Sequence, residues 1–234
     1  MAFSEEVRAR LDADADRIIP RYPKPRSALL SLLHLVQAEE GHVSRDGIAY
    51  CADRLGLTET DVTGVVGYYT MYKRHPVGEY HIGVCTNTLC AIMGGDQILA
   101  GLREHLGTTG AEATPDGKVS LEHVECNAAC DFAPVVMVNW EFFDNMTPDS
   151  ARALADDLRS GREVRPSRGP DRLCTFREAS RILAGFPDGR AGEGPQAGDA
   201  TLAGLRIAKE RGWTAPPPPP PAAPAAAGAE GGQP

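Results

Sequence analysis

Four cysteines are the residues of this 234-residue chain whose type and spacing could do chemistry. Cys85 and Cys90 form a C-x4-C pair, and Cys126 and Cys130 form a C-x3-C pair. Each pair directly follows a short run of alternating apolar residues, and such runs predict β-strands that lead into loops. Because strand ends in a small α/β domain can converge on one point, the four thiols could serve one site.

The start of the chain favours a bound metal over two disulfides. Residues 1–8 show no basic segment followed by an apolar one, so we expect no secretion signal and a chain that stays in a reducing cytosol. Thiols remain free in that compartment. Four thiolates brought together there indicate a metal centre.

The spacing of the cysteines separates the possible metals. Structural zinc sites favour Cys pairs two to four residues apart, often C-x2-C. Iron–sulfur clusters accept more varied spacings, because two sulfide-bridged irons need one thiolate pair each. We therefore expect an iron–sulfur cluster, with zinc as the alternative. A thioredoxin-type redox dithiol would need C-x-x-C, which the sequence lacks.

Small or short polar residues stand between the paired cysteines. They are Thr86, Asn87 and Thr88 in the first pair and Asn127, Ala128 and Ala129 in the second. Such residues let backbone N–H groups approach the sulfur atoms and tune the reduction potential of a cluster. The same residues are also common in ordinary turns, and both roles are compatible.

The other candidate ligands are expected to be structural. Cys51 lies on the apolar face of an expected helix and should be a small core residue. Cys174 lies just outside a helix cap and should play no part in the site. His34 and His42 stand near a leucine-rich face, where a lone His is usually packed or solvent-tipped.

Charge and hydropathy exclude several classes of function. The net charge is −8, and residues 77–150 hold 2 Lys or Arg against 11 Asp or Glu. This balance argues against a nucleic-acid partner and favours a basic protein surface or a plain solvated face. No stretch approaches eighteen consecutive apolar residues, so we expect no membrane-spanning segment. We find no Ser-His-Asp set, catalytic carboxylate pair or nucleotide motif, so no complete active site is expected in this chain alone.

Apolar spacing and cap residues predict an α+β fold. Residues 1–76 should form an N-terminal four-helix bundle. Residues 77–160 should form a small α/β sandwich in the order strand, helix, strand, strand, strand, helix, with its third strand from Val135 to Trp140. An extended tail with two short helices is expected over 161–215, and a Pro/Ala-rich disordered end over 216–234.

Several stretches resemble one known family. The segment Y-T-M-Y-K-R-H-P-V-G-E-Y-H-I-G-V-C from Tyr69 to Cys85, the two Cys pairs and the segment A-P-V-V-M-V-N from Ala133 to Asn139 carry this resemblance. They are similar to the thioredoxin-like [2Fe-2S] ferredoxin family, found as a small subunit of NADH:quinone oxidoreductase, the respiratory complex I. The resemblance covers about residues 4–160. It implies a thioredoxin-like fold and one [2Fe-2S] cluster ligated by Cys85, Cys90, Cys126 and Cys130.

Two positions depart from the family pattern. The family often has Pro before its second cysteine and Gly two residues before its fourth. This chain has Leu89 and Ala128 at those positions. The departures concern the conformation of the ligand loops and leave the four cysteines in place.

The resemblance also implies a function. It predicts an electron-transfer subunit of the NADH-oxidising module of complex I, which exchanges an electron with FMN on a partner. FMN and NADH would be held by that flavin-binding subunit, and a multi-cluster iron–sulfur subunit would be the second partner. The chain would be cytoplasmic and peripheral to the inner face of the plasma membrane through the complex. The alternatives are the equivalent subunit of an NAD-linked hydrogenase or formate dehydrogenase, and a zinc-stapled module without redox activity.

The two helices of the tail should bury their apolar side chains on a partner. Those side chains are Phe176, Ile182, Leu183, Leu202, Leu205, Ile207 and Trp213. Helices so short are marginal alone and need a surface to pack on. We expect a partner subunit rather than the chain's own domain, because electron transfer requires a lasting, oriented contact.

Overall fold

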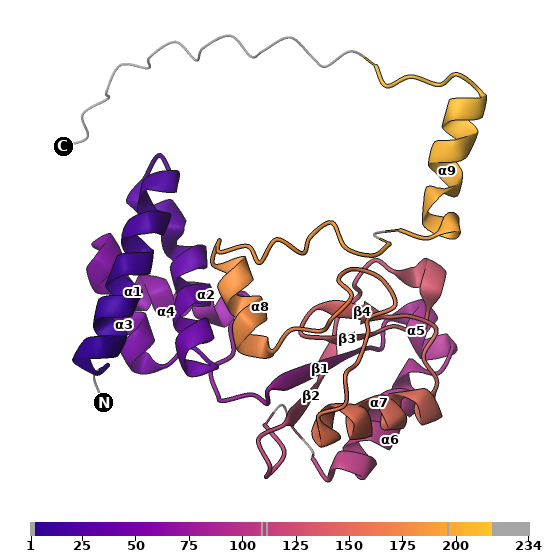
Figure 1. Cartoon of the computed structure of the whole chain (residues 1–234), viewed down its shortest axis with the longest axis horizontal. Coiled ribbons are helices and arrows are strands. Elements are labelled where there is room, and N and C mark those ends of the chain that lie inside the picture. The colour runs from indigo at the N-terminus through magenta and orange to yellow at the C-terminus, as the bar shows by residue number, and fades with distance from the viewer. Residues whose placement is uncertain (1–2, 109, 111, 196, 217–234) are drawn as a thin grey trace, which may run out of the picture. The chain divides into compact units, whose positions relative to one another are not determined.

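The structure is a computed structural model that describes residues 3–108, 110, 112–195 and 197–216. The described residues up to 195 form one compact unit, and residues 197–216 belong to a second. Figure 1 shows the elements of both units in chain order. The predicted end at 216–234 lies outside the described residues from 217 onward, and the boundaries predicted at 76 and 160 stay predictions.

The first four helices form the predicted bundle. They are α1 (Glu5–Ile18), α2 (Leu29–Glu40), α3 (Arg45–Leu55) and α4 (Glu59–Tyr68), and the short 3-10 turns Ile19–Arg21 and Pro25–Ala28 connect the first two. The caps follow the sequence signals. Ser4 Oγ accepts the Val7 N–H, and Thr58 and Asp61 form a capping box at the start of α4. Leu11, Leu32 and Tyr50 are among the side chains that fill the core between these helices.

Four strands form one mixed sheet. They are β1 (Tyr80–Cys85), β2 (Val119–Val124), β3 (Val136–Val138) and β4 (Glu141–Phe143), in the spatial order β2-β1-β3-β4. β1 is parallel to β2 and antiparallel to β3, and β3 and β4 are antiparallel. The third strand is shorter than predicted. Asn139 and Trp140 both have positive φ, so they form the tight turn between β3 and β4 instead of extending β3.

Three helices accompany the sheet. α5 (Thr88–Ile92) is a short helix after β1, and α6 (Gly95–Leu106) follows after a break at Gly94, where we predicted one continuous helix. Gly94 has a φ of 112°, which a helix interior does not permit. α7 (Pro148–Ser160) packs against α6, and their apolar faces share a core with β1 and β2. Apart from the division of the first helix into α5 and α6, the predicted order of strands and helices is confirmed, and the fold is α+β.

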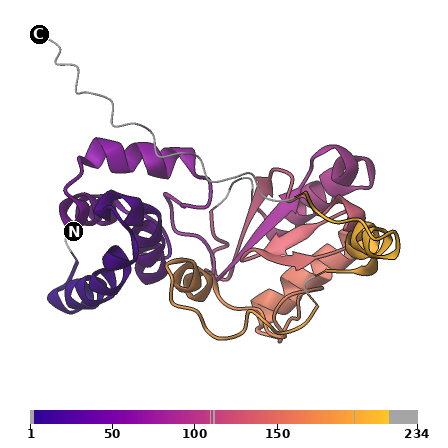
Figure 2. The same ribbon diagram turned by 90° about the horizontal axis from the view of Figure 1, so that it is seen from above.

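The first tail helix packs within the chain, so our expectation of a partner contact was wrong for this half. α8 (Phe176–Leu183) lies against α2, and both views show it between the bundle and the sheet (Figures 1 and 2). Phe176 is 1% exposed, and Ser180 Oγ accepts a hydrogen bond from Gln37 Nε2 at 3.3 Å. The bundle surface at α2 therefore receives this helix within the same chain.

The second tail helix remains unburied in its own unit. α9 (Asp199–Glu210) buries none of its residues, and Leu205 is 53% and Trp213 62% exposed. The expectation that this helix docks on a partner stays a prediction. None of the described helices is both long enough and apolar enough to cross a membrane.

Candidate metal centre

The four paired cysteines lie at, or shortly after, the ends of two neighbouring strands. Cys85 is the last residue of β1, and Cys90 lies on α5. Cys126 follows β2, and Cys130 begins the 3-10 turn Cys130–Phe132. Because β1 and β2 are parallel and Cys85 is aligned with Val124, both strands deliver their loops to one end of the sheet.

The thiols form two pairs that also influence each other. Cys126 Sγ and Cys130 Sγ are 3.8 Å apart. Burial, together with smaller contributions from the Cys85 and Cys130 thiols, raises the pKa of the Cys90 thiol to about 11. The hydrogen bond with Cys126 raises the pKa of Cys130. Cys90 and Cys130 are therefore protonated without a metal, and binding of a metal would release protons.

Cys85 and Cys90 are buried, whereas Cys126 and Cys130 are exposed. The buried pair lies in a small apolar group with Ala129, Ala133 and Val135. This group shields one side of the thiols from water. The other side faces solvent, which suits a site that exchanges electrons with another protein.

Gly95 is required by the close approach of α6 to both ligand segments. A Cβ atom at this position would lie 2.5 Å from the backbone oxygen of Cys85 and 2.9 Å from that of Cys90. Such contacts are far inside van der Waals distance, so only glycine fits without displacing the loop.

Two hydrogen-bond donors lie in the segment between Cys126 and Cys130, and both are of the kind that binds sulfur. Ala128 N donates to Cys126 Sγ at 3.3 Å, as expected for a small residue beside the sulfur. Within the described residues, the buried Nδ2 of Asn127 has no hydrogen-bond partner. A thiolate or bridging sulfide would accept such a donor. Four thiols with these donors therefore fit an iron–sulfur cluster.

The described residues contain no compact site for a single metal ion. In the part of the chain that the structure describes, no three His, Cys, Asp or Glu side chains gather closely enough to hold one metal ion. The four cysteines instead stand as two thiol pairs. Their assignment as one ligand set stays a prediction.

The remaining cysteines and His34 are packed. Cys51 is fully buried in the bundle, where burial raises the pKa of its thiol to about 12. Cys174 is buried too, and its carbonyl accepts from Asn139 Nδ2 at 2.8 Å. His34 packs against Tyr72 at 4.8 Å between ring centroids, and burial lowers its pKa to about 4. These residues hold the fold together.

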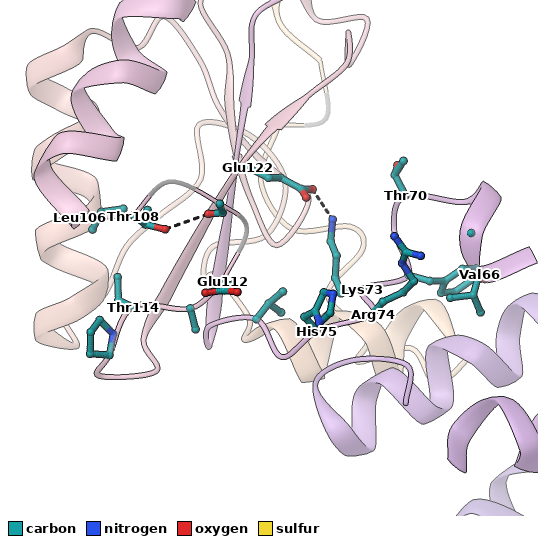
Figure 3. A pocket seen from close by; sticks show the side chains of 17 residues that line it. Val66, Thr70, Lys73, Arg74, His75, Leu106, Thr108, Glu112, Thr114 and Glu122 are labelled. Carbon is teal, nitrogen blue, oxygen red and sulfur yellow. Dashed lines mark hydrogen bonds and ion pairs between the residues drawn. The ribbon is translucent and has the colours of Figure 1, made fainter. Parts of the chain in front are cut away.

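Sequence reasoning missed a buried charged group near the second loop. His81 Nδ1 lies 2.7 Å from Ser120 Oγ, and His81 Nε2 lies 2.9 Å from Glu122 Oε1. Lys73 forms an ion pair with the same carboxylate, drawn in Figure 3 at a hollow of about 730 Å³. Burial would raise the pKa of Glu122, but His81 and Lys73 outweigh burial and hold it at about 2. His81 on β1 and Ser120 and Glu122 on β2 are polar residues at buried or half-buried positions of largely apolar strands. This pattern was the sequence signal for the group.

Comparison with known proteins assigns the chain to a family. Residues 15–159 match the thioredoxin-like [2Fe-2S] ferredoxin family. The chain belongs to this family. The resemblance noted for the cysteine pairs is thus confirmed, and the match ends just before the tail.

Curated relatives agree with this assignment. The chain is 58% identical to the E subunit of NADH-quinone oxidoreductase from Mycobacterium tuberculosis over 217 residues, which cover 92% of this chain and 86% of the relative. It is 37% identical to NADH-quinone oxidoreductase subunit 2 of Thermus thermophilus over 147 residues, which cover 62% of this chain and 81% of that protein.

One solved structure supports the fold. The chain is similar to an NAD+-reducing [NiFe]-hydrogenase with a TM-score of 0.51 at 16% identity, over 57% of this chain and 23% of that one. At this identity, the likeness shows a shared fold and nothing about function.

Proposed function

We propose that this chain is the electron-transfer subunit of the NADH-oxidising module of a proton-translocating NADH:quinone oxidoreductase. It carries one [2Fe-2S] cluster on Cys85, Cys90, Cys126 and Cys130. The observation that supports this proposal is that the parallel strands β1 and β2 lead the segments of both thiol pairs to one end of the sheet. The similarity to the mycobacterial NADH-quinone oxidoreductase subunit over nearly the whole chain supplies the context.

Each part of the site has a role toward the cluster. The [2Fe-2S] cluster supplies one-electron transfer when bound. The four thiolates hold the irons. The side-chain Nδ2–H group of Asn127 and the backbone N–H group of Ala128 stabilise negative charge on sulfur. The apolar group around Cys85 and Cys90 excludes water from one side, and Gly95 lets α6 support both segments.

The partners follow from the role of the chain. A flavin- and NADH-binding subunit holds FMN and NADH and exchanges an electron with the cluster, and a multi-cluster iron–sulfur subunit belongs to the same module. The chain has no complete active site alone. It is held at the inner face of the plasma membrane by the complex.

The ligand assignment is tested by single substitutions. Cys85→Ser, Cys90→Ser, Cys126→Ser and Cys130→Ser should each lower the iron content and bleach the visible absorption. The matched controls are Cys51→Ser and Cys174→Ser, which should keep both because Cys51 is packed in the bundle core and Cys174 is buried beside Asn139. A Cys126→Ser chain with the full iron content of wild type would show that Cys126 is not a ligand.

The choice of complex is tested by co-purification. A tagged chain expressed from its own genome should retain subunits of an NADH:quinone oxidoreductase. Retention of hydrogenase or formate dehydrogenase subunits instead would assign the chain to that complex. A colourless chain with zinc would contradict a redox role altogether.

A further inference from the structure

The segment 162–175 between α7 and α8, here called the strap, runs along the outer edge of the sheet. Ser167 N donates to the carbonyl of Phe142 at 2.8 Å, and Ser167 Oγ accepts from Asp144 N at 2.8 Å. β4 is the last strand of the sheet, so these bonds cover its open side. The strap lies beyond residues 15–159, the part that matches the family.

Arg168 of the strap is largely covered and lies against two rings and one carboxylate. Its Nη2 lies 3.0 Å from Asp144 Oδ1, with the two side chains 14% and 9% exposed. The guanidinium carbon lies 4.2 Å from the ring centroid of Phe142 and 5.2 Å from that of Phe132. Both are cation–π distances. Its Nε is buried without a hydrogen-bond partner among the described residues, so the rings and Asp144 hold the group.

Both rings belong to the surroundings of the paired cysteines. Phe132 ends the 3-10 turn that begins at Cys130, and its carbonyl accepts from Asn145 N at 2.9 Å. Phe142 packs against the apolar group that contains Cys85 and Cys90. The Arg168 guanidinium therefore contacts one ring beside each cysteine pair, Phe132 beside Cys130 and Phe142 beside Cys85 and Cys90.

We propose that Arg168 is a positioning residue of the metal centre. Its guanidinium holds Phe132 and Phe142 in place, and with them the two ligand loops, while its charge offsets that of Asp144. The inference rests on the proposed cluster. It assigns to the strap a role in the stability and the reduction potential of that cluster.

The charge of the pair sets the expected direction of each effect. Arg168→Met leaves the Asp144 carboxylate buried without its counter-charge. Reduction adds negative charge to the cluster, so the reduction potential should become more negative. Asp144→Asn leaves Arg168 uncompensated and should make it more positive. Opposite shifts from the two halves of one ion pair would not arise from loosened packing alone.

The test uses the full chain with its cluster. Arg168→Met should lose iron to a chelator about tenfold faster than wild type, followed by bleaching, because the cation–π contacts are lost. Arg168→Lys should keep the potential near the wild-type value but still lose iron faster, since an ammonium lacks the planar guanidinium. Arg165→Met is the matched control. Arg165 lies in the same strap and pairs with Asp171 at the surface.

Two outcomes would overturn the inference. Arg168→Met could match Arg165→Met in both potential and iron loss, or it could lower the melting temperature with an unchanged potential. If Arg168→Met does not accumulate as a folded chain, the reduction potential of Asp144→Asn decides. A more positive potential than that of wild type supports the inference, and an equal or more negative one overturns it. A wild-type chain that holds no cluster would contradict the proposed function instead.

Discussion

One residue between Cys126 and Cys130 holds a backbone conformation that its type does not favour. Ala128 has a φ of 54°, in the left-handed region that costs an L-residue about 1–2 kcal/mol. This is the position at which the family often carries Gly. The departure noted in the sequence thus has a local physical consequence, and the loop keeps its conformation despite it.

Ala128→Gly should stabilise the chain. The gain should be about 0.5–1 kcal/mol, because relief of the left-handed φ is offset in part by the greater freedom of Gly in the unfolded state. Thermal unfolding of the cluster-bearing chain measures it. Ala129→Gly is the control and should destabilise, since Ala129 has a φ of −111° and is buried. Equal effects of the two changes would contradict this account.

Gly95→Ala should damage the site and the fold together. The added methyl group meets backbone rather than side chains, and such overpacking costs about 1–3 kcal/mol. Lower iron content and a lower free energy of unfolding are expected. Gly101→Ala in the same helix meets only the end of the Arg152 side chain and should be neutral or slightly stabilising. A Gly95→Ala chain with wild-type iron and stability would show that α6 can move away.

His34 should make the stability of the bundle depend on pH. Its folded pKa of about 4 lies below the unfolded value of 6.5, so between these values the unfolded chain binds more protons. Stability should therefore fall as the pH falls from about 6.5 to 4, by about 3 kcal/mol. Urea unfolding at several pH values should show a shallower fall in His34→Gln, whatever its stability at neutral pH. His42→Gln is the control, and equal slopes in all three chains would contradict the assignment.

At the scale of elements, α8 joins the bundle to the sheet. Phe176 N donates to the carbonyl of Glu79 at 2.8 Å, and the Phe176 ring lies 5.3 Å from that of Trp140. Arg181 pairs with Asp14 of α1 at 2.7 Å. This helix is therefore part of the folded unit, although a Gly/Pro-rich stretch precedes it in the sequence.

Removal of α8 should lower the melting temperature by many degrees. Phe176→Ala alone should cost about 3–5 kcal/mol, because a fully buried ring is lost. Leu205→Ala, on the exposed α9, should stay within about 0.5 kcal/mol of wild type. Truncation after residue 161 should act like Phe176→Ala or more strongly, whereas truncation after residue 196 should leave the melting temperature unchanged. Equal melting temperatures for the two truncated chains would show that α8 does not support the unit.

Across the whole chain, features formed by residues close in sequence could be predicted, whereas contacts between residues far apart in sequence could not. The caps at Ser4 and Thr58 lie within three residues of the N–H groups that they bind, so the sequence shows them directly. The cysteine pairs are equally local. Asn139 is different, because it bonds His81 on β1 and Cys174 in the strap, and no spacing connects residues so far apart.

The error about the tail has the same origin. An amphipathic helix shows that a surface must receive it but not which one. The surface of α2 that receives α8 exists only after the bundle has formed. The ion pair of Arg168 with Asp144 also joins residues from two separate segments, and neither residue differs in the sequence from an ordinary surface charge.

The central claim is that the four cysteines of this chain hold one [2Fe-2S] cluster. The most direct measurement is the content of iron, zinc and acid-labile sulfide in the chain purified without oxygen. We predict about two irons and two sulfides per chain, with visible absorption and no stoichiometric zinc. One zinc per chain without sulfide would contradict the claim.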